Sequence, residues 1–248
     1  MILLGDIGNT ESKICLVNSK NKIIKKFNFT TKNINYLLLK KISLKLNLKK
    51  NKVKKSLFCS VVPKSFKLIK FFFYKHYKLN CYELKDLKIN KLIKIKVNNN
   101  QIGSDRLANA ISVMNNKNNF IILDFGTATT FDVVIKNVYH GGVIAPGLRL
   151  SLNTLIDKAS LIPNLDLKKI NKVIGLNTIN AVRSGFFWGY RGLINNIISL
   201  IKKETKKSFK IIITGGFSYL FRNSINMKVT INKDITIKGL IKASNLIK

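Results

Sequence analysis

Acidic residues are scarce in this chain of 248 residues. Asp and Glu number 11 against 45 Lys and Arg, so the formal net charge is +34 at pH 7. Lysine supplies almost all of this charge, mostly in residues 1–96 and 166–248, whereas residues 97–165 hold 5 basic and 4 acidic residues. Scattered lysine together with abundant Asn and Ile is typical of an AT-rich genome. We therefore expect no specific nucleic-acid partner, only weak binding of polyanions at low salt.

Cysteine and histidine are also rare. The odd number of widely spaced cysteines (Cys15, Cys59 and Cys81) argues for reduced thiols and against a disulfide framework or a zinc site. His76 and His140 do not lie at metal-ligand spacing to another candidate. No apolar run of about 20 residues and no signal peptide are present, so we expect a cytoplasmic protein with no membrane partner.

Apolar residues, by contrast, make up 46% of the chain, enough for a buried core in one large domain or two smaller ones. The central stretch, residues 121–135, reads as strand, tight turn and strand: Asp124 ends the first strand, and Gly126 and three threonines (127, 129 and 130) fill the turn. Gly126 permits a positive φ or a close approach to a ligand, and the threonine hydroxyls suit phosphate oxygens. Alternatively, these side chains only satisfy turn amides.

The same pattern occurs in residues 3–17, where Asp6 and Gly8 match Asp124 and Gly126 at an offset of 118 residues. A duplicated strand–Asp–x–Gly–turn–strand pattern predicts two similar halves that offer phosphate-facing hairpins to a shared cleft. This layout is seen in the actin-like kinase superfamily. We therefore predict an α/β fold of two actin-like (ribonuclease H-like) halves, residues 1–115 and 116–248. Each half is a mixed sheet flanked by helices, and the active site lies in the cleft between them.

Further along the chain, Gly103-Ser104-Asp105-Arg106 precedes apolar residues at helical spacing, so Ser104 or Asp105 is expected to cap a helix. Asp105 is either only that cap or a base for a substrate hydroxyl, with Arg106 as a clamp for a carboxylate. Residues 141–147 predict a loop into a helix that begins near Leu148. Residues 179–203 predict a long helix, whose three glycines (185, 189 and 192) suggest a closely packed partner.

Together these stretches resemble type III pantothenate kinases, which phosphorylate pantothenate at the start of coenzyme A synthesis. The resemblance covers essentially the whole chain in family order. The matching stretches are DIGNT (6–10), SVVP (60–63), GSDRLAN (103–109), LDFGTATTFD (123–132), GGVIAPG (141–147), GLNT (175–178), TGGF (214–217) and DITIKGL (234–240).

The resemblance implies a role for each matching residue. Asp105 is implied as the general base, with Gly103, Ser104, Asp105, Arg106 and Thr178 as the pantothenate site. The residues implied for ATP binding are Asp6, Ile7, Gly8, Asn9, Thr10, Glu11, Ser12, Lys13, Thr127, Gly215 and Gly216. Asp6 is implied near Mg²⁺, and Asp124 as a ligand of a monovalent cation, K⁺ or NH₄⁺. A homodimer whose partner subunit closes the substrate pocket is also implied.

Two departures from the family pattern stand out. An aromatic residue and an Asn-Pro pair often precede the GSDR motif in the family, whereas here Lys96-Val97-Asn98-Asn99 stands there. The positive charge also exceeds what the family usually shows. Two alternatives stay open: another actin-like phosphotransferase acting on a sugar or small acid, and a catalytically silent relative that binds nucleic acid.

Overall fold

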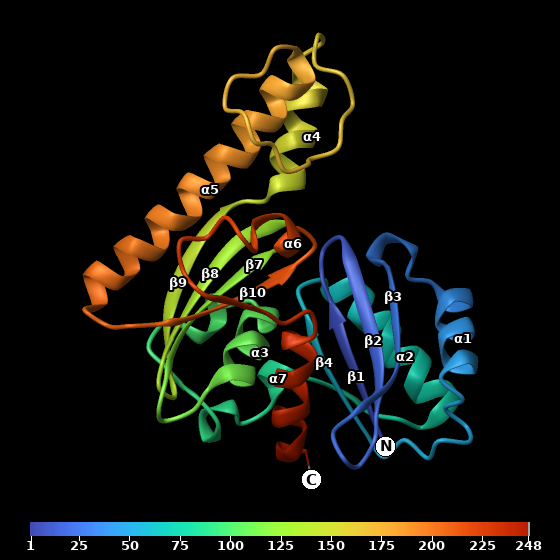
Figure 1. Ribbon diagram of the computed structural model, residues 1–248. Helices are drawn as coiled ribbons and strands as arrows, with labels where there is room; N and C mark the ends of the chain where they lie inside the picture. Colours follow the sequence, from blue (N-terminus) through green and yellow to red (C-terminus); the bar gives the residue numbers. More distant parts are fainter. Residues whose placement is uncertain (248) are drawn as a thin grey trace. The chain divides into compact units, whose positions relative to one another are not determined.

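A computed structural model describes residues 1–247, and their internal contacts form two compact units. Unit 1 contains Met1–Met114, Asn137–Tyr139 and the C-terminal segment from Asp234. Unit 2 contains Asn115–Lys136 and His140–Lys233. Each unit is built on a mixed sheet with helices, as Figure 1 shows, so the predicted α/β class with two mixed sheets is confirmed.

The sheet of unit 1 has the strand order β3-β2-β1-β4-β5. Its strands are β1 (Ile2–Ile7), β2 (Glu11–Val17), β3 (Ile23–Thr30), β4 (Lys55–Ser60) and β5 (Cys81–Glu83). The first three form the expected antiparallel meander, and β4 and β5 run parallel to β1. Side chains alternate between the two faces of a strand. Asp6 on β1 therefore points to the face opposite Leu3 and Ile7.

Two pairs of helices belong to unit 1: α1 (Tyr36–Lys45) with α2 (Pro63–Tyr77), and α3 (Ser104–Val113) with α7 (Ile235–Ala243). Apolar residues of α1 and α2 share one core with Leu3, Ile7 and Phe58 of the sheet. The other pair, α3 and α7, pack on each other and both contact β4. Short 3₁₀ turns cover Thr31–Asn33, Leu84–Asp86, Ile89–Lys91, Asn99–Gln101 and Ser244–Leu246.

The C-terminal helix α7 is thus part of unit 1, although it lies beyond the sequence of unit 2. The predicted second half comprises all of residues 116–248. The boundary between the halves at residue 115 remains a prediction. The internal contacts assign the segment from Asp234 to unit 1, which contains β1. The chain therefore returns to its first unit at its end, and this return brings α7 close to β1.

The sheet of unit 2 is formed around the predicted hairpin. Its strands are β7 (Asn119–Phe125), β8 (Ala128–Ile135), β9 (Val138–Pro146), β10 (Lys210–Gly215) and β11 (Val229–Ile231), in the order β11-β10-β7-β8-β9. The short strand β6 (Lys94–Ile95) pairs with Val138 and Tyr139 at the start of β9, which belong to unit 1. The predicted loop at residues 141–146 is wrong, because pairing with β8 extends β9 through both glycines.

Three helices complete unit 2: α4 (Leu148–Lys158), α5 (Thr178–Thr205) and the short α6 (Ser218–Phe221). The predicted helix starts near residues 148 and 179 are confirmed. Leu152 of α4 and Phe187 and Ile194 of α5 share a core with Ile121 and Leu123 of β7. Along α5, by contrast, a Cβ added at any of the three glycines would meet nothing within 4 Å among the described residues. The predicted close packing partner of these glycines is therefore not part of the described chain.

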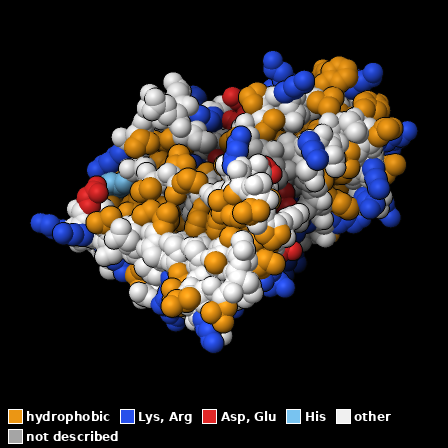
Figure 2. Space-filling view, turned by 90° about the horizontal axis from the view of Figure 1, so that it is seen from above, with side chains coloured by type: hydrophobic (Ala, Val, Ile, Leu, Met, Phe, Trp, Pro, Cys, Tyr) orange, Lys and Arg blue, Asp and Glu red, His pale blue; other side chains and the backbone are white. Residues whose placement is uncertain are grey.

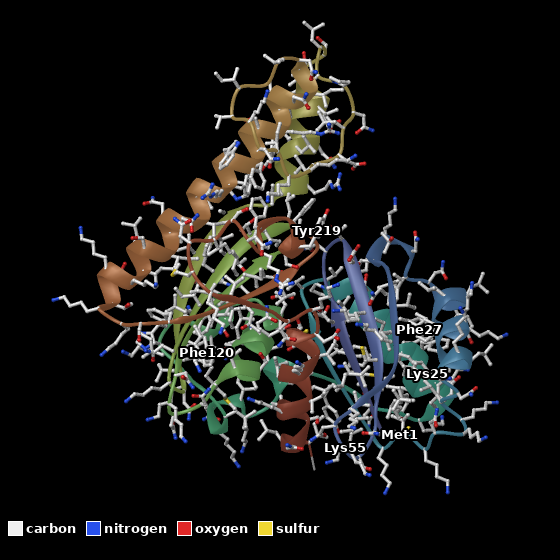
Figure 3. The ribbon with its side chains drawn as sticks, viewed as in Figure 1. Met1, Lys25, Phe27, Lys55, Phe120 and Tyr219 are labelled. Atoms are coloured by element: carbon white, nitrogen blue, oxygen red, sulfur yellow. The ribbon has the colours of Figure 1, made fainter. Side chains whose placement is uncertain are left out.

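Lys and Arg side chains are scattered over the face that Figure 2 presents. Some pack on aromatic rings, as at the β3 edge, where Figure 3 labels Lys25 and Phe27. Lys25 Nζ donates to the carbonyl of Lys45 at 2.7 Å, and Lys45 Nζ lies 5.5 Å from the centre of the Phe27 ring. Lysine stems thus shield apolar surface while their charges stay in water. No helix within residues 1–247 is long and apolar enough to cross a membrane.

Candidate active site

Asp6 lies near the end of β1, on the face of the sheet toward α3 and α7. Strand pairing places it directly between Lys13 on β2 and Cys59 on β4. Cys59 Sγ lies 3.5 Å from Asp6 Oδ1, and the Thr236 side chain also hydrogen-bonds this carboxyl. Burial raises the pKa of Asp6 to about 6, with Lys13 lowering it and Asp105 raising it further. A cation beside this carboxyl would favour its ionised form.

The buried hydroxyl of Thr31 hydrogen-bonds the backbone of the turn that follows Asp6. Gly8 N donates to the carbonyl of Glu11 at 3.1 Å, and a Cβ on Gly8 would lie 2.7 Å from that oxygen. The Thr31 hydroxyl donates to the carbonyl of Gly8 at 2.7 Å and lies 2.8 Å from Ser12 Oγ. Ile7 and Ser12 are buried, so their side chains belong to the scaffold of the predicted ATP loop. The exposed side chains of the turn are those of Asn9, Thr10 and Glu11.

The start of α3 differs from the predicted cap. The N-cap is Gly103, which offers no side chain, so neither Ser104 nor Asp105 caps the helix. Ser104 is buried, and its Oγ accepts the N–H of Ser60 at 2.8 Å. Asp105 Oδ1 accepts the N–H of Arg106 at 2.8 Å, and a Cβ on Gly103 would lie 2.4 Å from this oxygen. Glycine at 103 therefore leaves room for a half-buried carboxylate in the first turn of a helix, where anions are favoured.

Glu83, which no sequence pattern indicates, supports this helix start. Its carboxylate accepts the N–H of Lys85 at 2.6 Å and that of Ser60 at 3.4 Å. It also hydrogen-bonds the Ser104 side chain, and burial raises its pKa. Glu83, Ser60 and Ser104 thus tie the end of β4 to the start of α3. A lone Glu in a three-residue strand carries no sequence signal for this role.

In unit 2, Asp124 occupies a position like that of Asp6. It lies on β7 directly between Thr130 on β8 and Thr214 on β10, as Asp6 lies between Lys13 and Cys59. The structure thus contains both predicted hairpins, and in each unit a further parallel strand, β4 or β10, pairs with the strand that carries the Asp. A carboxylate flanked by two threonines is an oxygen-rich setting, which suits a hard cation.

A hydrogen bond between residues only two apart closes the β7–β8 turn. Gly126 N donates to the carbonyl of Ala128 at 3.1 Å. Its φ is not positive, so that one of its two predicted roles is wrong, whereas a close approach to a ligand stays a prediction. Thr129 is fully buried, so its hydroxyl does not face a phosphate as predicted; the two-residue alternation of β8 turns it inward. Thr127 is exposed at the tip. A Cβ on Gly147 would lie 2.1 Å from the carbonyl oxygen of Thr127, so the start of α4 approaches this tip closely.

The glycine turn after β10 lies at the same edge of the sheet. Gly215 has φ +85°, and a Cβ there would lie 2.5 Å from the carbonyl oxygen of Phe125. Gly216 N donates to that oxygen at 3.2 Å. The structure therefore brings Asp124, Thr127 and the two glycines together at one end of the sheet of unit 2. This edge offers backbone N–H groups and a hydroxyl for a phosphate or a nucleoside.

Thr178 stands on another element, at the first position of α5. Asn177 caps this helix by accepting the N–H of Asn180 at 2.9 Å. Thr178 is exposed, and the preceding Ile174 and Leu176 are 80% and 87% exposed. Apolar side chains so open to water are typical of a surface that a partner covers.

The acidic residues fit the two implied cations without forming a closed metal cage. Among residues 1–247, no cluster of three or more His, Cys, Asp and Glu side chains could hold a metal ion. Mg²⁺ in phosphate-transfer sites needs only one or two carboxylates in addition to phosphates and water. Asp6, held by neighbouring donors beside an exposed turn, meets this requirement. Asp124 and its flanking threonines offer oxygen ligands for a monovalent cation.

The chain is similar to one family along most of its length. A family model described as type III pantothenate kinase matches residues 2–200. A type III pantothenate kinase of Pelagibacter ubique (strain HTCC1062) is 73% identical over 248 residues, which is 100% of both chains. Another, from Sulfurihydrogenibium sp. (strain YO3AOP1), is 36% identical over 249 residues, covering 97% of this chain and 98% of the relative.

Solved structures share the fold at low identity. A Campylobacter jejuni protein described as a Baf family transcriptional activator has a TM-score of 0.63 at 18% identity, covering 97% of this chain and 96% of its own. The activator of 2-hydroxyisocaproyl-CoA dehydratase from Clostridium difficile, solved with bound ADPNP, has a TM-score of 0.53 at 11% identity, covering 98% and 92%. These likenesses show the fold alone, and they agree with the predicted actin-like architecture.

Proposed function

The chain belongs to the type III pantothenate kinase family, and on that premise we propose how its own residues perform the reaction. The protein is an ATP-dependent kinase that phosphorylates pantothenate, the first step of coenzyme A biosynthesis. The observation that carries this conclusion is the 73% identity to a pantothenate kinase over the full length of both chains. Because the reaction consumes ATP, we place it in the cytoplasm.

Asp105 is the general base of the proposed mechanism. It takes the proton of the pantothenate primary hydroxyl as the oxygen attacks the γ-phosphorus, and ADP leaves with the electrons of the broken bond. Gly103, Ser104 and Arg106 complete the substrate site, with the Arg106 guanidinium on the pantothenate carboxylate. The tie between Glu83 and Ser104 supports this proposal, because it fixes the helix turn that carries Asp105.

The ATP-binding residues of this proposal are the turn residues that the resemblance implies. In unit 1, the stretch from Asp6 to Lys13 surrounds phosphate oxygens with turn amides and the Lys13 ammonium. In unit 2, Thr127 donates its hydroxyl to a phosphate, and Gly215 and Gly216 lie against the adenosine. When bound beside Asp6, Mg²⁺ neutralises charge on the transferred phosphoryl group. Asp6 contributes the carboxylate of this site from the end of β1, between Lys13 and Cys59.

Asp124 is the ligand of a monovalent cation, K⁺ or NH₄⁺. Its position between Thr130 and Thr214 in the strand ladder supports this assignment, because both residues carry neutral oxygens that need no counterion. Such a cation adds positive charge close to the Thr127 turn without the strict octahedral geometry that Mg²⁺ requires. We therefore expect turnover to depend on the monovalent cation in the buffer.

The active form is a homodimer, with a partner subunit against α5 and the segment before it. Two observations on unit 2 support this proposal. The glycines of α5 leave its surface open, and an apolar groove of about 370 Å³ runs between α4 and α5. Its lining includes Leu155, Phe186, Tyr190 and Leu193. A partner helix that packs on these glycines would also cover the exposed segment that leads to Thr178, the proposed pantothenate contact.

The decisive assay measures ADP release from ATP and Mg²⁺, with and without pantothenate, in K⁺ buffer and then in Na⁺ buffer. We expect turnover that requires pantothenate and is faster in K⁺. Turnover with a sugar or another small acid in place of pantothenate would favour a different phosphotransferase. A folded protein with no turnover, whose binding to DNA falls steeply with salt, would favour a catalytically silent nucleic-acid-binding relative.

A further inference from the structure

Two polar residues of unit 1 form a buried hydrogen bond between α7 and α3. Thr236 Oγ1 donates to Asn109 Oδ1 at 2.9 Å, and the two residues are only 7% and 1% exposed. Both lie in the stretches that resemble the family, GSDRLAN and DITIKGL, yet the proposed mechanism gives neither of them a role. A buried polar pair gains little net stability over a well-packed apolar pair of similar shape. Helix packing alone therefore does not explain why this pair is polar.

The contacts of Thr236 continue to the catalytic face of the sheet. Its side chain hydrogen-bonds the carboxyl of Asp6, and Cys59 Sγ lies 3.5 Å from Oδ1 of the same carboxyl. Burial keeps the pKa of the Cys59 thiol well above its usual value, so this group is a neutral S–H donor. The Asp6 carboxyl is thus held by α7 and by β4, while Lys13 faces it from β2.

We propose that Thr236, oriented by Asn109, is a positioning residue that fixes the Asp6 carboxylate in the orientation that receives Mg²⁺. The proposal rests on the proposed role of Asp6 in metal binding. The hydroxyl of Thr236 has one hydrogen, which it donates to Asn109 Oδ1 in the structure. To donate instead to the ionised Asp6 carboxylate, it accepts the side-chain N–H of Asn109 after that amide turns over. Asn109 suits the far end of this chain because its amide carries both an acceptor and a donor. An oriented carboxylate gives the cation a fixed ligand at no further ordering cost.

The test compares two substitutions that separate hydrogen bonding from packing. Thr236→Val keeps the shape of the side chain and removes the hydroxyl, whereas Thr236→Ser keeps the hydroxyl and removes a methyl group. If Thr236 positions Asp6, the Mg²⁺ concentration for half-maximal rate rises about tenfold in Thr236→Val and stays within about twofold of wild type in Thr236→Ser. If Thr236 only packs, Thr236→Ser is the more impaired variant, and the proposal is overturned.

A binding measurement accompanies the rates. Calorimetry with a non-hydrolysable ATP analogue, with Mg²⁺ and then with EDTA, should show a weaker Mg²⁺-dependent affinity in Thr236→Val and an unchanged affinity in EDTA. Thr205→Val on α5 is the matched control, because the Thr205 hydroxyl donates to the carbonyl of Ile201 at 2.7 Å, within its own helix. An equal loss in this control would overturn the proposal, since the same chemical change would then act without Asp6.

Loss of stability is separated from loss of positioning by a double variant. Thr236→Val alone leaves the buried Asn109 amide without this partner and is expected to lower the melting temperature. Thr236→Val with Asn109→Leu removes both polar groups and should restore much of the stability. We expect the double variant to fold and still to need about tenfold more Mg²⁺. Wild-type Mg²⁺ dependence in the folded double variant would contradict the proposal.

The variant Asp6→Asn shows whether the premise or the inference fails. If Asp6→Asn keeps the Mg²⁺ dependence of the wild type, Asp6 is not the metal carboxylate, and both the premise and the inference are overturned. If Asp6→Asn loses that dependence but Thr236→Val keeps it, the proposed function stands and only the positioning role of Thr236 is refuted.

Discussion

Gly239 on α7 lies directly against the backbone of Ala108 on α3: a Cβ at residue 239 would be 1.8 Å from the Ala108 carbonyl oxygen. No side chain fits there without moving one helix. We predict that Gly239→Ala destabilises the protein by about 2–3 kcal/mol through overpacking. The measurement is the midpoint of urea unfolding followed by circular dichroism.

Gly216→Ala is the matched control, because a Cβ at Gly216 would meet nothing within 4 Å in the described chain. We expect its stability to stay within about 0.5 kcal/mol of wild type, as for an ordinary surface substitution. If Gly239→Ala unfolds at the same urea concentration as this control, the two helices can separate freely, and the contact between α3 and α7 is not rigid.

The raised pKa of Asp6 predicts a dependence of stability on pH. The pKa rises from the ordinary 3.8 to about 6, so the folded state binds the proton more tightly than the unfolded state. The ionised carboxyl therefore destabilises the fold as the pH rises from about 4 to above 6. Asp6→Asn removes this titration. We expect its gain in unfolding free energy over wild type to be larger at pH 7.5 than at pH 4, by about 1–3 kcal/mol.

Urea unfolding at the two pH values, in EDTA and without nucleotide, checks this expectation. Without the chelator, bound Mg²⁺ would offset the cost of the buried charge and reduce the difference. The same gain at both pH values would mean that Asp6 titrates as an ordinary surface carboxyl does. It would also remove the physical basis for expecting a cation beside Asp6.

Turn chemistry made the two hairpins recognisable, because a hairpin depends on residues that are close in the sequence. Asp6 and Asp124 each end an apolar strand, and the structure places each between two strand partners in its own unit. The burial of Thr129 follows from the two-residue alternation of β8, which is a local signal in the sequence. Gly126, likewise, reads as a turn residue whatever φ it adopts, so its value could not be predicted from the residue type.

Contacts across long stretches of sequence could not be predicted in this way. Thr236 reaches Asp6 only because the chain returns to unit 1 after unit 2, and Asn109 meets Thr236 across 127 residues. No local spacing encodes that return. One signal in the sequence pointed to these two residues. Both lie in stretches that match the family, and the resemblance implies no role for either of them. The N-cap of α3 shows a smaller limit, since tertiary bonds to Ser60 engage Ser104 before it can cap its own helix.

Asp105→Asn is predicted to leave the fold intact and to lower turnover by about 10²-fold or more, the usual scale for loss of a general base. The amide has nearly the same shape, and its oxygen can still accept the Arg106 N–H that Asp105 Oδ1 accepts at 2.8 Å. Steady-state kinetics with pantothenate, together with a thermal melt, separate chemistry from folding. A folded variant with near wild-type turnover would remove Asp105 from the role of base.

The open face of α5 gives a prediction about assembly. Gly189 lines the apolar groove, and a Cβ at this position would meet nothing within 4 Å among residues 1–247. An arginine there is therefore tolerated by a monomer but opposes a partner helix with bulk and charge. We expect the wild type to sediment as a dimer of 28.1 kDa chains and Gly189→Arg as a folded monomer with a higher KM for pantothenate.

Ser199→Arg is the control for this prediction, because Ser199 is exposed on the same helix but does not line the groove. It adds the same charge, so it should remain a dimer if the groove is the interface. A monomeric wild type would contradict the dimer itself, and a dimeric Gly189→Arg would place the interface elsewhere. If Gly189→Arg is monomeric but keeps its KM for pantothenate, the partner subunit does not close the pocket, and the pantothenate contact of Thr178 must be made within one chain.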